Sequence, residues 1–202
     1  MAQIDKDGWV INAHVHLAKR AFQKHGAMTH VSGDIVHQTG ASTAAASLNS
    51  YQSKGANGAH FLIDKDGSIS QTGSVLWKLW HVGKLRARCL AEHRCTAVET
   101  KALSKMQPSA VNRHEMAKAA PDRYPANVDS VGIELVGGVI GDAADQPKGK
   151  DLPYEPATEA QNLSLKWLVD ELRQNLGVPL TEIFRHPDVS RKNPHEAESA
   201  RW

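Results

Sequence analysis

Residues 128–138 read VDSVGIELVGG, and this largely apolar run decides the fold. Its length and its β-branched residues predict a central strand of a sheet. Glu134 places a charge inside the run, and a charge in a central strand is costly unless it is paired or functional. Glu134 therefore either faces solvent at an edge or end of the sheet, or serves as a general base whose pKa is raised by burial.

The clearest helix follows this strand, over residues 158–176. Thr158 and Gln161 have the spacing of a capping box, in which each side chain satisfies a backbone N–H of the first turn. Gly177 supplies the stop. Residues 182–185 then predict a short strand that delivers His186 to the loop beyond. The helix carries one apolar stripe at three- and four-residue spacing, made by Leu165, Leu168, Leu172 and Leu176.

The N-terminal half shows the same alternation of strands and helices. Residues 34–39 predict a buried strand that runs into a loop, and residues 42–54 predict a helix. Residues 58–71 hold Asp66 and Gly67 between two strand-like runs, which predicts a hairpin whose turn needs a positive φ. Helices that alternate with strands indicate an α/β domain with a central mixed β-sheet flanked by helices.

The chain has 202 residues, which fits one domain with a small extension. We expect an N-terminal arm over residues 1–30 and the main domain over residues 31–202. Residues 85–125 are polar, basic and interrupted by prolines, and they predict a long insertion with short helices that lies over one face. An insertion of this length inside a compact domain is usually functional.

Two cysteines, Cys89 and Cys95, lie in this insertion with His93 between them. Three states are open from the sequence. The thiols are unpaired, or they form a local disulfide that implies an oxidising compartment, or they bind a metal together with His93. The spacing is not one of the common zinc patterns.

The composition argues against several classes of partner. The formal net charge is +2, and the chain has no run of Lys or Arg that would follow phosphates, so nucleic acid is not expected. No apolar run approaches the ~18 residues of a membrane span. Residues 1–7 lack the basic-then-apolar pattern of a secretory signal, so we expect synthesis in the cytoplasm without a signal peptide.

Two histidines, His37 and His186, stand at the ends of predicted strands. Strand ends converge at one edge of an open α/β sheet, where such folds place their sites. Catalytic zinc takes about three protein ligands from imidazole nitrogen and carboxylate oxygen. The alternative for His37 is a buried structural histidine. Lys192 is either a solvated surface residue or an electrostatic clamp on an oxyanion.

Four blocks of the sequence together resemble the zinc-dependent N-acetylmuramoyl-L-alanine amidases. That family shares its fold with phage lysozyme-type amidases and peptidoglycan recognition proteins. The resemblance runs from about residue 33 to residue 202, with HVG at residues 81–83 between the second and third blocks. The blocks are IVHQT (35–39), GAHFLIDKDG (58–67), NVDSVGIELVG (127–137) and HPDV (186–189) with Lys192.

The resemblance implies that His37 and His186 are zinc ligands. It also implies that Glu134 is the general base and that Lys192 stabilises the transition state. The implied reaction is hydrolysis of the amide that joins the lactyl group of N-acetylmuramic acid to L-alanine, in peptidoglycan or in a soluble muropeptide.

The third ligand departs from the family pattern, which places Asp or Cys two residues after the lysine. That offset holds Pro194, whose side chain cannot bind a metal. Asn193 is a poor zinc ligand. Glu196 is preferred, because it lies ten residues past the second histidine, a spacing that recycling amidases use for their Asp. His195 is the alternative third ligand.

A second departure is Ala59, where some members of the family carry a tyrosine near the metal. Glu134 would then act without that tyrosine. His60 and His81 are predicted to bind substrate, and the alternative for His81 is to cap the core.

The biological role stays open between several alternatives. A non-catalytic peptidoglycan-binding module is the main alternative to an active amidase, and a zinc peptidase with another substrate is a third. An active enzyme would be a recycling enzyme, a phage lysin or an antibacterial effector injected by a type VI-like secretion system. We expect the effector, which acts in the periplasm of a target bacterium or on the cell wall and has an immunity protein as its partner.

Overall fold

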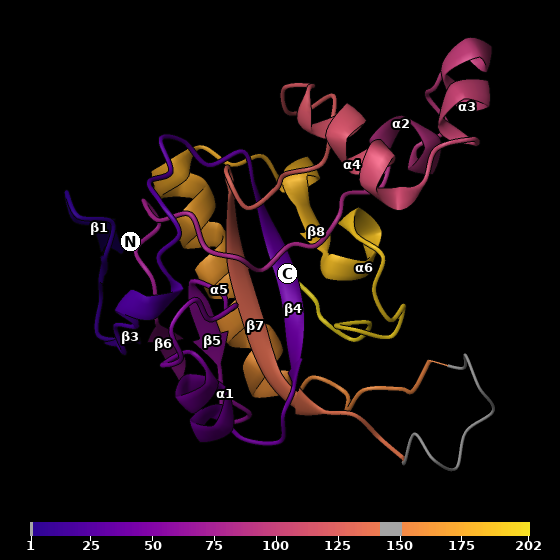
Figure 1. The fold of residues 1–202 in the computed structure, drawn as a ribbon. Helices are drawn as coiled ribbons and strands as arrows, with labels where there is room; N and C mark the ends of the chain where they lie inside the picture. Colours follow the sequence, from indigo (N-terminus) through magenta and orange to yellow (C-terminus); the bar gives the residue numbers. More distant parts are fainter. Residues whose placement is uncertain (1, 142–150) are drawn as a thin grey trace.

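A six-stranded mixed sheet forms the centre of the computed structural model, which describes residues 2–141 and 151–202 (Figure 1). The strand order is β3-β6-β5-β7-β4-β8. The predicted α/β class, with a mixed sheet flanked by helices, is confirmed. The strands are β3 (Val15–Leu17), β4 (Gly33–Gly40), β5 (Phe61–Ile63), β6 (Ile69–Gln71), β7 (Ser130–Gly138) and β8 (Ile183–Arg185).

Strand β7 is the central strand that the apolar run predicts. It lies between β5 and β4 and runs parallel to both. Side chains alternate between the two faces of a strand. Val131, Ile133 and Leu135 point to one face and are fully buried in the main core. Glu134 therefore lies on the opposite face.

Helix α5 (Glu159–Leu176) covers the apolar face of the sheet (Figure 1). It begins with the predicted capping box of Thr158 and Gln161 and ends at Gly177, whose φ is 74°. Its leucine stripe packs against the strands. Each fully buried leucine contributes roughly 2 kcal/mol relative to an exposed one, so this stripe holds the helix on the sheet.

Two further predicted elements are present near the other face. Helix α1 (Ala44–Ser50) is capped by the Thr43 hydroxyl and is shorter than expected. Strands β5 and β6 form the predicted antiparallel hairpin. Gly67 has a φ of 88°, and a Cβ there would lie 2.9 Å from the Ala160 carbonyl oxygen, so the turn requires glycine.

The N-terminal segment contributes to the central sheet. Strand β3 pairs in parallel with β6 at the sheet edge, while β1 (Gln3–Ile4) and β2 (Val10–Ile11) form a separate two-stranded sheet. A short 3-10 helix, η1 (Ala21–Gln23), follows. The buried Gln71 amide accepts from Val10 N and donates to the Gly8 carbonyl. Residues 1–30, expected as an arm, thus share a sheet with the main domain.

The insertion over residues 85–125 is built from α2 (Arg88–Ala91), α3 (Ala97–Leu103) and α4 (Pro108–Met116). Figure 1 shows these helices gathered on one side of the sheet, away from α1. Cys89 and Cys95 form a disulfide, which decides between the three states that the sequence left open. Across the described residues, none of the helices is long and apolar enough to cross a membrane.

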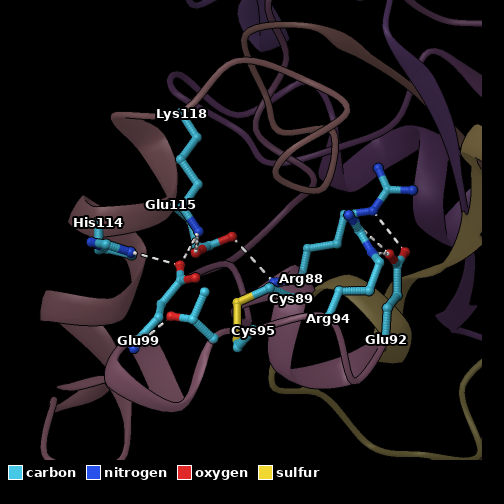
Figure 2. Close-up of a disulfide and its surroundings, with 10 residues drawn as sticks. Arg88, Cys89, Glu92, Arg94, Cys95, Glu99, His114, Glu115 and Lys118 are labelled. Atoms are coloured by element: carbon cyan, nitrogen blue, oxygen red, sulfur yellow. Dashed lines mark hydrogen bonds and ion pairs between the residues drawn. A yellow bond between two sulfur atoms is a disulfide. The ribbon is translucent and has the colours of Figure 1, made fainter. Parts of the chain in front are cut away.

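One buried ion pair fastens the insertion to the rest of the domain, and others tie its helices together. Arg88 binds both carboxylate oxygens of Glu182, in η3 (Leu180–Glu182), at 2.7 and 2.8 Å. Beside the disulfide, Lys118 donates to Glu99 and Glu115 (Figure 2). Bidentate pairs fix orientation as well as energy. The Arg88–Glu182 pair therefore ties the insertion to the 3-10 turn that precedes β8 and His186.

Candidate active site

Parallel pairing brings three distant residues to one edge of the sheet. Strands β7 and β8 flank β4 and run parallel to it. His37 on β4 stands opposite Glu134 on β7. Strand β8 ends at Arg185, and His186 begins the short helix α6 (His186–Val189). The parallel register thus places His37 beside Glu134, and His186 follows the carboxyl end of the neighbouring strand β8.

His37, His186 and Glu196 converge at this edge and are all buried. His186 Nδ1 lies 3.0 Å from Glu196 Oε1, and His37 Nδ1 lies 3.5 Å from the same oxygen. Glu196 is held here by the turn that carries it, because Ala197 N donates to the Gln38 side chain on β4. The C-terminal turn is therefore tied to the strand that carries His37.

Two of these side chains, His37 and Glu196, have the ionisation states that a divalent metal requires. Burial lowers the pKa of His37 to about 4, and the nearby His186 adds to this, so the His37 ring is neutral at neutral pH. Burial raises the pKa of Glu196, but its contacts with the neighbouring His186 and His37 outweigh burial and hold the pKa at about 2. A carboxylate thus faces a neutral imidazole.

The residues present fit zinc. Tetrahedral zinc with bonds of about 2.0–2.1 Å separates its ligand atoms by about 3.3 Å, and the two measured separations lie on either side of this value. The donor set of two imidazole nitrogens and one carboxylate oxygen is also one that catalytic zinc takes. His37, His186 and Glu196 would hold the ion.

His195, the alternative third ligand, lies outside this cluster. Its Nδ1 is 2.8 Å from Glu198 Oε2, and its ring is partly exposed. The side chain is held by a neighbour three residues along the chain, so the structure does not bring it to His37 and His186.

Tyr51 lies in the candidate site beside Glu134, and the sequence analysis did not predict it as a site residue. It directly follows α1, is buried, and its hydroxyl donates a hydrogen bond to Glu134 Oε2. Gly58 makes room, since a Cβ there would lie 2.8 Å from the Tyr51 ring. The sequence held one indirect signal for Tyr51. Ala59 stands where some members of the family carry a tyrosine near the metal, so a tyrosine from another segment could take that role.

Glu134 is partly buried in this groove, and its ionisation is tuned by three neighbouring influences. Burial raises its pKa, the hydrogen bond from Tyr51 lowers it and the negative charge of Glu196 raises it, and the resulting pKa is about 7. A carboxyl group with a pKa near neutrality exchanges protons readily at physiological pH.

The cluster opens into a groove of about 630 Å³, within the roughly 300–1,000 Å³ typical of ligand sites. Lys192 is exposed at its rim, and its positive charge contributes to lowering the pKa of His37. The residues that line the groove include His37, Tyr51, Trp80, His81, Glu134, Tyr154, His186, Lys192 and Glu196.

The two predicted substrate-binding histidines have both ring nitrogens engaged by the protein. His60 is fully buried; its Nδ1 accepts from Gly132 N and its Nε2 lies 2.9 Å from the Trp77 carbonyl oxygen. It has no free nitrogen for a substrate, because backbone groups of β7 and of the loop after β6 occupy both. His81 lines the groove, but its nitrogens face His37 and Ser130.

The sequence matches a protein-family model described as N-acetylmuramoyl-L-alanine amidase over residues 27–196. The resemblance seen in the four sequence blocks is therefore confirmed. A search of curated proteins finds no significant match.

Solved structures share the fold at low sequence identity. The catalytic domain of XlyA is 18% identical with a TM-score of 0.53, over 90% of this chain and 88% of that one. A selenomethionine derivative of AmpD is 16% identical with a TM-score of 0.54, over 94% and 92%. AmpDh3 from Pseudomonas aeruginosa is 17% identical with a TM-score of 0.53, over 96% of this chain and 61% of that one.

Proposed function

The chain belongs to the N-acetylmuramoyl-L-alanine amidase family, and from this premise we propose that it is an active, zinc-dependent amidase of peptidoglycan. Its substrate is the amide between the lactyl group of N-acetylmuramic acid and L-alanine. The observation that carries the proposal is the convergence of His37, His186 and Glu196 in one groove with Glu134.

His37, His186 and Glu196 would hold the zinc ion. When bound, zinc polarises a carbonyl group and lowers the pKa of water towards ~7. The remaining chemistry belongs to side chains of the groove. Glu134 takes a proton from the attacking water and passes it to the leaving amine of L-alanine, a role that suits its pKa of about 7.

Two further side chains support this reaction. Lys192 places a positive charge at the rim of the groove, where it stabilises the oxyanion that forms when water attacks the amide carbon. Tyr51 donates to Glu134 and so fixes the orientation of the base. The products are a lactyl carboxylate on the sugar and a peptide with a free amino terminus.

Digestion of purified sacculi tests the proposal. We expect stem peptides with a free L-alanine amine in the mass spectrum of the products. The release should stop when a chelator is added and resume when zinc is restored. Disaccharides released with their peptides still attached would identify a glycosidase and contradict the proposal.

A non-catalytic peptidoglycan-binding module is the second candidate. Such a module needs neither a general base nor a cation at the oxyanion, so Glu134 and Lys192 in the groove favour the enzyme. Binding to sacculi without any released peptide, even with zinc at one equivalent, would establish the module instead.

We further propose that the protein acts in the periplasm of a target bacterium, as an effector whose groove an immunity protein covers. The Cys89–Cys95 disulfide supports an oxidising site of action. Expression directed to the periplasm of a bacterial host should lyse the cells, whereas cytoplasmic expression should not. Equal toxicity in both compartments, or a neighbouring gene product that neither binds nor inhibits, would count against the effector role.

A further inference from the structure

His81 contacts the metal-binding histidine His37 on the side away from the other two donors. His81 Nδ1 lies 3.0 Å from His37 Nε2, and the two rings are nearly perpendicular, at 79°. The other nitrogen of His37, Nδ1, lies 3.5 Å from Glu196 Oε1. Each nitrogen of His37 therefore has its own partner.

The far side of the His81 ring decides which of its nitrogens carries the proton. His81 Nε2 lies 3.3 Å from the Ser130 carbonyl oxygen and 3.2 Å from Ser130 Oγ. A carbonyl oxygen can only accept a hydrogen bond. The Ser130 hydroxyl spends its own proton on the Ala126 carbonyl, at 2.7 Å. Since both neighbours of Nε2 are acceptors, His81 carries its proton on Nε2 and leaves Nδ1 as an acceptor.

The tautomer of His81 in turn fixes the tautomer of His37. Because His81 Nδ1 accepts, His37 Nε2 must carry a proton and donate it. A neutral imidazole has a single ring proton, so His37 Nδ1 keeps a bare lone pair. That lone pair faces the Glu196 carboxylate, an arrangement that repels until a cation lies between them.

The backbone around His81 holds the ring in this orientation. His81 N donates to the Asn127 side chain at 3.0 Å. A Cβ at Gly132 would lie 2.7 Å from His81 Nδ1, so only glycine at that position of β7 lets the ring sit against the strand. The ring is thus part of the framework.

From these contacts we infer that His81 is a positioning residue, which sets the tautomer of His37 and turns its Nδ1 lone pair towards the metal-binding side. The inference rests on the proposed zinc site and assigns His81 a task other than the predicted contact with substrate. Metal-binding histidines commonly donate their second N–H to such a partner, and loss of the partner lowers metal affinity about 10- to 100-fold.

Zinc titration of the full chain, in competition with a chromophoric chelator, tests the inference. We expect His81→Leu to weaken zinc binding about 10- to 100-fold. His81→Asn should recover much of the loss, because its amide oxygen can accept from His37 Nε2. The matched control is His60→Asn, which alters another histidine beside Gly132 but leaves His37 untouched and should keep the wild-type affinity.

Ring-nitrogen NMR of the metal-free protein gives a second readout that needs no variant of His81. We expect His37 to carry its proton on Nε2, with its signals assigned by their loss in His37→Gln. A proton on Nδ1 would overturn the inference, as would a folded His81→Leu protein with wild-type zinc affinity. A wild-type protein that binds no zinc would instead refute the proposed function, and the tautomer would still decide the role of His81.

Discussion

Strand β4 carries a buried ionisable side chain in each half, and the two halves differ in what surrounds them. At the amino end, Asp34 is fully buried between its strand neighbours Val131 and Ile183. Among the described residues, neither of its carboxylate oxygens has a hydrogen-bond partner. In the carboxyl half, His37 contacts a carboxylate and two other histidines.

Burial raises the pKa of Asp34 to about 7, and it raises the pKa of Glu134 in the groove to the same value. A perturbed pKa alone therefore does not distinguish a catalytic carboxyl from a buried one. The two carboxyl groups differ in whether other functional side chains surround them. Glu134 accepts a hydrogen bond from Tyr51 and lines a groove. The carboxyl group of Asp34, in contrast, is enclosed in the core.

Removal of Glu196, the carboxylate of the proposed zinc site, should give the largest effect. Glu196→Ala is expected to lower kcat/KM at least about 10⁴-fold, because zinc supplies both the polarised carbonyl and the acidic water. Peptide release from sacculi and zinc content by mass spectrometry check this. The matched control at the other end of β4 is Asp34→Asn, which should keep both. A fully active Glu196→Ala protein would contradict the assignment of the zinc site to the groove.

Loss of Glu134, the proposed general base, should give the second-largest effect. Glu134→Gln keeps the size of the side chain but cannot take a proton, so we expect kcat to fall about 10³-fold. Zinc content should stay at the wild-type level, since Glu134 is not among the three converging donors. If the variant lost zinc as well, Glu134 would be a ligand and the assigned roles would be wrong.

Tyr51→Phe should shift the pH dependence of the reaction. The hydrogen bond from Tyr51 favours the ionised form of Glu134 and lowers its pKa, so its removal raises that pKa. The acidic limb of the kcat profile should then move to higher pH by about one unit, roughly a tenfold loss of rate at pH 6. Tyr124→Phe, in a separate small core, is the control and should keep the wild-type profile.

Asp34→Asn should change stability rather than activity. The folded protein holds the Asp34 proton up to about pH 7, whereas the unfolded chain releases it near pH 3.8, so stability falls as the pH rises between these values. The variant removes this penalty and should be more stable at pH 8 by on the order of 2–4 kcal/mol. Near pH 3.5 the gain should vanish. Urea unfolding at pH 8 and near pH 3.5 measures the gain in stability. An equal gain at both pH values would contradict the unpaired state of Asp34.

Local elements were predictable because short segments contain their own hydrogen-bond partners and turn residues. The capping box at Thr158, the stop at Gly177 and the turn at Gly67 all appear where the sequence placed them. The apolar run of residues 130–138 likewise became the central strand. Strand β3 was not placed in the sheet, because its pairing with β6 depends on residues more than fifty positions away.

The sequence by itself determined the class of the fold, the family, and two strand-end histidines, since these depend on periodicity, turn chemistry and motif order. Only the tertiary structure decided which side chains meet. Parallel pairing placed His37 beside Glu134, and a turn tied to β4 selected Glu196 over His195. Such choices depend on strand register and on backbone space at glycines, which no local stretch of sequence encodes.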